Sequence, residues 1–230
     1  MIGTLKIRVR ECGFTLLEIL MAAFIFSIIA TTIFGSFRAV FSTTETLHSG
    51  MEAFEMVSGS LDRMTSDITS ACVATSPGYF PPKGENPPDP YRIVGDSGPL
   101  VEGDFARLRF ASYAHLPMGK ERPGGIAQIV YYVEPAEENR YVLKRADHLP
   151  PYPDLEEPGN DPILIEGIKS LKFLYYDTEG TEHETWDSES QEFKYATPTA
   201  IRIRVEIGDD SGSFFFETMV NLPIVREPRE

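Results

Sequence analysis

The chain has 230 residues, 42% of them hydrophobic, and a formal net charge of −14 at pH 7. This length and composition allow one membrane-spanning segment and one globular domain of ordinary size. The excess of acidic residues argues against nucleic acid as a direct ligand, because phosphate binding requires a concentration of Lys and Arg.

A long apolar run follows a short basic leader at the N-terminus. The run extends for 22 residues from Phe14 to Gly35, and Glu18 is its only ionisable side chain. At about 1.5 Å per residue, a helix of this length crosses a bilayer core of about 30 Å. The leader carries three bases and one acid. The positive-inside rule therefore predicts a cytoplasmic leader and places residues 36–230 on the other side of the membrane.

The candidate processing site lies before the apolar run rather than after it. A secretory signal peptide ends in small residues behind its apolar region, whereas here the small residue Gly13 precedes that region. Cleavage at Gly13 would remove residues 1–13 as a leader. The apolar helix, expected over residues 14–35, would remain in the mature protein.

The residues around this site resemble the class III signal of type IV pilins and pseudopilins. That signal is a Gly, then Phe-Thr-Leu-Leu/Ile-Glu, then a hydrophobic helix, and Gly13 to Glu18 reproduce it without a gap. The resemblance implies that a membrane-embedded prepilin peptidase cleaves between Gly13 and Phe14 and N-methylates Phe14. Glu18 then becomes the fifth residue of the mature chain.

Glu18 is expected to act in assembly. A carboxylate near the start of a membrane-spanning helix is unfavourable unless a partner neutralises it, and the new ammonium group on Phe14 of a neighbouring subunit is a natural partner. Such a pair also fixes the axial stagger between subunits, since a slip of one turn leaves both charges unpaired in hydrocarbon. The alternative is an ordinary single-pass anchor that happens to carry a Glu.

Processing also changes the charge and the cysteine content. Loss of residues 1–13 takes the net charge from −14 to −16, because it removes three bases and one acid. It also removes Cys12 and leaves Cys72 as the one cysteine, so no intramolecular disulfide forms in the mature chain. We expect Cys72 to be a small buried hydrophobic residue at the end of a helix. A reactive thiol or an intermolecular bridge is the alternative.

Beyond Gly35 the helical pattern continues without a membrane composition. Apolar residues recur every three or four positions, which indicates one apolar stripe on an amphipathic helix. The stripe comprises Leu47, Met51, Phe54, Val57, Leu61, Met64, Ile68 and Ala71, and the charged residues expected on the wet side are Glu45, Glu52, Glu55, Asp62, Arg63 and Asp67. We expect residues 36–75 to continue the membrane helix and to pack on the protein's own sheet.

Residues 76–230 alternate between Pro-rich loops and strands. The loops at 77–99 and 147–162 are too rich in Pro and Gly for regular structure, apart from a short edge near 91–94. Alternating apolar and polar residues predict strands around residues 106–110, 129–133, 141–144, 171–175, 201–207 and 214–222. The pattern predicts an antiparallel meander of one or two sheets with one face buried. The expected fold is therefore α+β and pilin-like, with the long helix packed on the sheet.

Weaker patterns along the rest of the chain are similar to minor pseudopilin J of the bacterial type II secretion system. The helix ends in an L-x-R-x-x-x-D-I segment, a Tyr-rich strand precedes a D-x-x-G turn, and a Trp precedes a P-x-A-I-R-I strand. The matching residues include Leu61, Arg63, Asp67, Ile68, Trp186, Pro198 and Ala200 to Ile203. A minor type IV pilin of the W class, for pilus assembly, twitching or DNA uptake, is the alternative.

Resemblance to J implies a function without catalysis. The subunit would be a single-pass inner-membrane protein with a cytoplasmic N-terminus and a periplasmic C-terminal domain, and would join the periplasmic pseudopilus after processing. There it would form a tip complex with subunits I and K and support protein export. The implied partners are these two subunits, the major pseudopilin and the prepilin peptidase.

No enzymatic site is expected. His48, His115, His148 and His183 stand in unrelated contexts without metal-ligand spacing, and no phosphate loop or G-x-S-x-G elbow occurs. The acid-rich stretch 177–189 lacks the spacing of an EF-hand loop, so we expect a solvated charged loop rather than a calcium site. We expect no cofactor and no metal, with a membrane-anchored periplasmic enzyme as a distant alternative.

Overall fold

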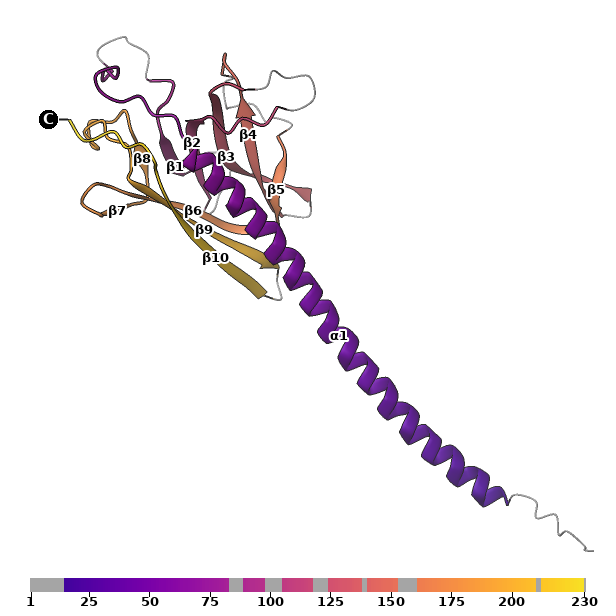
Figure 1. Cartoon of the computed structure of the whole chain (residues 1–230). Helices are drawn as coiled ribbons and strands as arrows, with labels where there is room; N and C mark the ends of the chain where they lie inside the picture. Colours follow the sequence, from indigo (N-terminus) through magenta and orange to yellow (C-terminus); the bar gives the residue numbers. More distant parts are fainter. Residues whose placement is uncertain are drawn as a thin grey trace, which may run out of the picture. The chain divides into compact units, whose positions relative to one another are not determined.

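The computed structural model describes residues 15–82, 89–97, 105–117, 124–137, 140–152, 161–209 and 212–229. Side chains are described in these ranges except at 38–50, 52, 97 and 209. The described elements are one long helix and ten strands (Figure 1). The chain divides into two compact units, Met1–Glu52 and Ala53–Glu230.

The helix α1 (Leu16–Thr69) has 54 residues and includes both the apolar run and most of the amphipathic segment. It ends at Thr69 rather than near residue 75. The cause is a change of hydrogen-bond partner: the backbone N–H of Cys72 donates to the carbonyl of Ala111 at 2.8 Å, and Ala71 forms a β-bridge with Ser112. Cys72 itself is partly buried, with Sγ 3.6 Å from the hydroxyl of Tyr113.

Two antiparallel sheets follow the helix. One has the strand order β5-β4-β3-β2-β1-β8, and the other has the order β10-β9-β6-β7 (Figure 1). The strands are β1 (Val94–Ser97), β2 (Ala106–Ser112), β3 (Ala127–Pro135), β4 (Tyr141–His148), β5 (Ile163–Glu166), β6 (Ile168–Tyr176), β7 (Glu182–His183), β8 (Trp186–Asp187), β9 (Ala200–Asp209) and β10 (Gly212–Asn221). The predicted α+β, pilin-like fold is confirmed, with two sheets.

The strands differ from the prediction mainly where they are short. β5, β7 and β8 have four, two and two residues, too few for an alternating pattern to be recognised in the sequence. The edge expected near 91–94 is β1, which begins at Val94 and lies between β2 and β8. β4 continues to His148, so the second Pro-rich loop begins after that residue.

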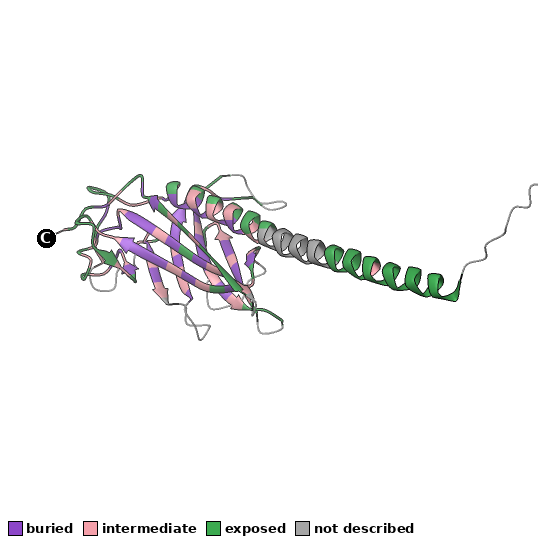
Figure 2. Ribbon diagram, turned by 90° about the horizontal axis from the view of Figure 1, so that it is seen from below, coloured by how far each residue is buried: buried purple, intermediate pink, exposed green. Residues whose placement is uncertain are grey.

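The core of the second unit lies where residues 53–69 of α1 meet the inner faces of both sheets (Figure 2). Alternate residues of the central strands point inward: Ile201, Ile203, Val205 and Ile207 of β9 are at most 3% exposed. Burial of this apolar surface, worth about 25 cal/mol per Å², is the main force that holds the layers together. The two sheets approach closely at Gly95, where an added Cβ would lie 1.8 Å from the Tyr175 hydroxyl.

The predicted helix stripe is buried only in its second part. Its buried or half-buried members are Val57, Leu61, Met64, Ile68 and Ala71. Met51 and Phe54 are 62% and 58% exposed, so the stripe begins to contact the core at Val57. The side chain of Leu47 lies outside the described residues.

The expectation that Asp67 faces solvent is wrong, because its side chain is fully buried. Arg145 of β4 donates from Nε to Asp67 Oδ2 at 2.6 Å and from Nη2 to Oδ1 at 3.3 Å. The Tyr131 hydroxyl on β3 donates to Oδ2 at 2.5 Å, and Arg63 forms an ion pair with the same carboxylate. A carboxylate is tolerated in a protein interior when it is paired and hydrogen-bonded in this way.

The network continues from Arg145 to Asp147 and His115. Arg145 Nη1 donates to Asp147 Oδ2 at 2.7 Å, and His115 Nδ1 lies 2.7 Å from Asp147 Oδ1. Burial opposes the charge on Arg145, but its hydrogen bonds and charge attraction to Asp67 raise its pKa above the ordinary value. Burial also opposes the charge on Asp147, but the hydrogen bonds from His115, the Leu116 backbone and Arg145 hold its pKa below the ordinary value. The network therefore connects α1 with β3, β4 and the segment after β2.

A second buried cluster anchors the C-terminal segment. The guanidinium of Arg226 donates to Glu189 Oε1 at 2.9 Å, lies 3.3 Å from Asp89 Oδ2 and stacks 3.5 Å from the centre of the Tyr79 ring. The Tyr79 hydroxyl donates to the same oxygen of Glu189 at 2.8 Å. Burial and this hydrogen bond raise the pKa of Tyr79 well above its ordinary value. The cluster joins the loop after α1, the β8–β9 connection and the C-terminal segment.

We predict that the Asp67–Arg145 pair is required for stability. Asp67→Ala should lower the free energy of unfolding by about 3–5 kcal/mol, because it leaves Arg145 buried without its main counter-charge. Joint replacement by Asp67→Leu and Arg145→Met should cost clearly less than the two single changes added together, since neither member of the pair is then left facing a missing counter-charge and Asp147 keeps its bonds to His115 and the Leu116 backbone. Denaturant unfolding of the detergent-solubilised chain measures each variant.

Arg107 and Asp96 form the matched control. They make a two-pronged pair at 3.0 and 2.9 Å, but their side chains are 26% and 36% exposed. Asp96→Ala should therefore cost no more than about 1 kcal/mol. Equal losses for Asp67→Ala and Asp96→Ala would contradict the role given to the buried pair.

Candidate functional site

Thr15 and Glu18 cap the start of α1 through reciprocal hydrogen bonds. The backbone N–H of Thr15 donates to Glu18 Oε2 at 2.9 Å, and the backbone N–H of Glu18 donates to the Thr15 hydroxyl at 3.3 Å. The Thr15 hydroxyl also donates to Glu18 Oε2 at 3.0 Å. This reciprocal arrangement is a capping box, which satisfies backbone donors at a helix start. It holds the Glu18 carboxylate at the N-terminal, positive end of the helix dipole.

Glu18 is the predicted site residue that the structure places, whereas Gly13 and Phe14 lie outside the described residues. Thr15 was not predicted as a partner of Glu18, although the Thr-x-x-Glu spacing is a capping-box signal. Among the described residues, both side-chain contacts of Glu18 are made by Oε2 and none by Oε1. One carboxylate oxygen thus caps the helix, and the other can accept a further donor.

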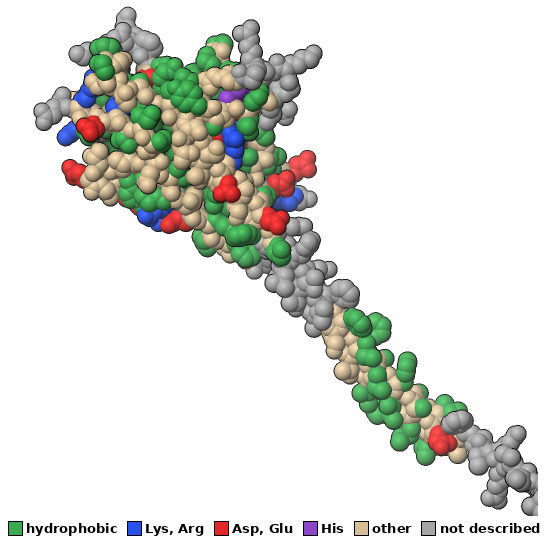
Figure 3. All heavy atoms as spheres, in the orientation of Figure 1, with side chains coloured by type: hydrophobic (Ala, Val, Ile, Leu, Met, Phe, Trp, Pro, Cys, Tyr) green, Lys and Arg blue, Asp and Glu red, His purple; other side chains and the backbone are tan. Residues whose placement is uncertain are grey.

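The helix that follows is apolar on every side. Residues Leu16–Phe37 form a candidate membrane span of 22 residues, and Figure 3 shows hydrophobic side chains along it, with one acidic side chain near its start. Phe24 and Phe26 are 63% and 72% exposed. The hydroxyls of Thr31 and Thr32 are satisfied within the helix by the carbonyls of residues 27 and 28, at 2.7 and 2.9 Å. Such a helix fits a single-pass membrane anchor.

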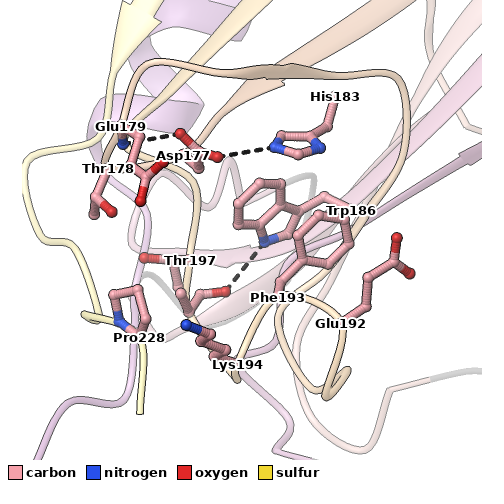
Figure 4. A pocket seen from close by; sticks show the side chains of 11 residues that line it. Asp177, Thr178, Glu179, His183, Trp186, Glu192, Phe193, Lys194, Thr197 and Pro228 are labelled. Atoms are coloured by element: carbon pink, nitrogen blue, oxygen red, sulfur yellow. Dashed lines mark hydrogen bonds and ion pairs between the residues drawn. The ribbon is translucent and has the colours of Figure 1, made fainter. Parts of the chain in front are cut away.

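A cavity of about 210 Å³ lies between the D-x-x-G turn, the β8–β9 connection and the C-terminal segment (Figure 4). The rings of Trp186 and Phe193 stack in its wall with their centres 4.1 Å apart. Trp186 Nε1 donates to the carbonyl of Ala196 at 3.1 Å. Lys194 and Tyr195, which follow Phe193, have φ angles of +49° and +61°, a backbone conformation that is costly for residues with a Cβ.

Asp177 and His183, which line this cavity, form a hydrogen-bonded pair that stabilises the surrounding backbone and rings. His183 Nε2 lies 3.0 Å from Asp177 Oδ2, and the hydrogen bond holds the pKa of Asp177 below its ordinary value. Asp177 Oδ1 also accepts the backbone N–H groups of Glu179 and Thr181, at 2.9 and 2.8 Å. The His183 ring packs edge-on against Trp186. Asp177 therefore stabilises the turn through its backbone hydrogen bonds, and His183 packs against the aromatic rings that line the cavity.

The acid-rich stretch is not the uniformly solvated loop that was expected. Glu189 is 9% exposed and belongs to the buried Arg226 cluster, while Asp177 closes a turn at the other end. Between them, Glu179, Glu182 and Glu184 are exposed. Within the part of the chain that the structure describes, no group of three or more His, Cys, Asp or Glu residues is arranged to hold a metal ion.

Comparison with protein families gives two matches. Residues 35–211 match the family described as type II secretion system (T2SS), protein J, and residues 8–34 match the prokaryotic N-terminal methylation motif. The methylation motif includes Gly13, Phe14 and Glu18. The protein J match covers the amphipathic part of α1 and all the strands up to β9. Among curated proteins the chain has no match.

The two matches agree with the structure described above. The methylation motif falls on the capped start of an apolar helix, and the protein J match, which covers more than half of the chain, falls on an α+β pilin-like domain. Proteins of this family are structural pseudopilin subunits. The chain therefore belongs to the type II secretion system protein J family and is a minor pseudopilin of that system.

Proposed function

We propose that this minor pseudopilin acts at the tip of the periplasmic pseudopilus, in a complex with subunits I and K, and supports the export of folded proteins. The observation that carries the proposal is the position of Glu18, a single carboxylate held at the capped start of an otherwise apolar helix. Membership of the family implies assembly with other pseudopilins. The identity of the partners and the position at the tip are our proposal.

Glu18 is the residue to which we assign the assembly contact. Its Oε2 atom is used by the capping box, and its Oε1 atom has no contact among the described residues. Cleavage between Gly13 and Phe14 keeps the Thr15 backbone N–H as an amide, so the capping box is compatible with the mature chain. The ammonium group on Phe14 of a neighbouring subunit then supplies a donor to Oε1, and the pair fixes the stagger between the two helices.

The orientation follows from the charge of the leader. Its three bases favour a cytoplasmic leader, where prepilin peptidase cleaves it, and a periplasmic location for the β domain. The protein J match supports a role in secretion over the alternative of a minor type IV pilin. It likewise supports a structural subunit over a membrane-anchored enzyme.

We predict that the mature chain begins at N-methylated Phe14. Mass spectrometry of the membrane form, isolated from cells that contain prepilin peptidase, should show this N-terminus, because Gly13 and Phe14 both lie within the matched methylation motif. Cells without the peptidase serve as the control and should retain residues 1–13. An N-terminus at Met1 in the presence of the peptidase, or one beyond Gly35, would refute the assignment.

The role of Glu18 can be separated from helix capping by matched variants. Glu18→Gln keeps an oxygen that can cap the helix but removes the charge, so cross-linking to partner helices and export should fall at least about tenfold while cleavage continues. Thr15→Ala removes the capping hydroxyl but keeps the charge, and its effect should be smaller. Normal cross-linking and export in Glu18→Gln would show that the ion pair is not needed.

The position in the tip complex predicts specific partners. When co-expressed in membranes, the full chain should co-purify with subunits I and K, and its deletion should abolish protein export but leave twitching and DNA uptake unchanged. The major pseudopilin alone is the control and should bind more weakly. Binding to neither I nor K, combined with loss of twitching or DNA uptake and normal export, would assign the protein to a pilus instead.

A further inference from the structure

The two described sheets have four edge strands, and β10 differs from the other three. β5, β7 and β8 have four, two and two residues, and short edge strands are one way in which proteins prevent unwanted strand pairing. β10 has ten residues and pairs with β9 over its whole length without a bulge. It lies at the end of its sheet (Figure 1), and in the described part of the chain its other edge is unpaired.

The register identifies the backbone groups on this free edge. The N–H of Leu222 donates to the carbonyl of Thr199 at 2.9 Å, and the same pairing continues without a shift to Gly212. In an antiparallel ladder the residues alternate between those bonded to the neighbouring strand and those that point away. The residues whose N–H and C=O groups point to the free edge are therefore Ser213, Phe215, Glu217, Met219 and Asn221.

The side chains of these residues leave the edge without the usual protection. Phe215 is 76% exposed and Met219 is 49% exposed. Glu217 is the only charged residue on β10, and it is paired with Arg204 and Arg202 of β9. The strand contains no Lys, no Pro and no bulge, which are the features that commonly block pairing at an edge. A long, regular edge with two exposed apolar side chains is a template for another strand.

We propose that the free edge of β10 binds a β-strand of a neighbouring pseudopilin, which extends the four-stranded sheet. This inference rests on the proposed function, because the neighbour in the assembly is the occupant. Backbone hydrogen bonds would give affinity, and apolar side chains that meet Phe215 and Met219 would give specificity.

Two observations favour a different subunit of the assembly as the occupant. Exposed apolar side chains lie on both sides of the free edge: Phe215 and Met219 on the outer face, and on the inner face Phe54 of α1, which is 58% exposed and whose ring lies 6.0 Å from that of the half-buried Phe216. A second copy of this chain is disfavoured, because each copy carries a net charge of −16 after cleavage and the two repel each other.

Photo-cross-linking in membranes that contain the other pseudopilins tests the proposal. A photoreactive phenylalanine analogue is placed at Phe215, at Phe80 as a matched control that is 79% exposed, and at Phe24 in the apolar helix as a report on assembly. We expect cross-links to another pseudopilin from positions 215 and 24 and none from position 80. Adding Met219→Lys should reduce the cross-link from position 215 at least about tenfold, whereas Phe80→Lys should leave it unchanged.

Hydrogen exchange separates strand pairing from simple side-chain contact. In the detergent-solubilised complex, the amides of Phe215, Glu217 and Met219 should exchange at least about tenfold more slowly than in the free chain. The amides of Phe214, Phe216 and Thr218 already bond to β9 and should change little. Thermal unfolding of each variant confirms that it is folded.

The outcomes distinguish this inference from the proposed function. Cross-links from position 24 without any from position 215, or unchanged exchange at the outward amides, would overturn strand pairing and leave the assembly role intact. Absence of cross-links from position 24 would overturn the assembly role and this inference with it. A cross-link from position 215 to a second copy of the chain would overturn the assignment of the occupant.

Discussion

The ion pair between Asp67 and Arg145 is the interaction on which the arrangement of helix and sheets depends. Apolar contacts hold α1 against the sheets, but they are non-directional and tolerate a shift along the helix axis. The buried ion pair does not tolerate such a shift, because movement of α1 relative to β4 would leave a charge without its partner in the protein interior. Tyr131 and Arg63 bond to the same carboxylate, so the position of the helix is defined from two strands and from its own neighbouring turn. The register of α1 on the β domain is therefore set by polar groups and stabilised by apolar ones.

The same physical principle acts at the other end of the helix, with one difference. Glu18 is also a carboxylate in surroundings that are apolar in a membrane, and its capping box with Thr15 uses only one of its oxygens. Asp67 finds its counter-charge within the chain, whereas for Glu18 we propose a counter-charge on another subunit. In this proposal α1 carries one carboxylate that is paired within the fold and one that is paired in the assembly. Such a division suits a subunit with a rigid domain and a helix that its neighbours position.

A subunit of this family acts through its surfaces, and the β domain protects most of its sheet edges. The short strands β5, β7 and β8 limit pairing at three of the described edges, and the Arg226 cluster holds the C-terminal segment against the loops. β10 lacks such protection and places Phe215 in solvent. Such an edge is a hazard in a free monomer and an advantage in a subunit that is covered on assembly.

Features that depend on neighbouring residues along the chain were predicted from the sequence. These are the apolar span, the processing motif with Glu18, the amphipathic helix, the longer alternating strands and the protein family. Each is encoded by residue type and spacing over a short segment, so a single sequence reveals it. Only the tertiary structure decided that Asp67 and Glu189 are buried, because their partners Arg145 and Arg226 are far away in the sequence. It also decided the strand order in the two sheets and hence that β10 lies at an edge, because pairing between distant strands depends on how the whole chain packs rather than on any local pattern.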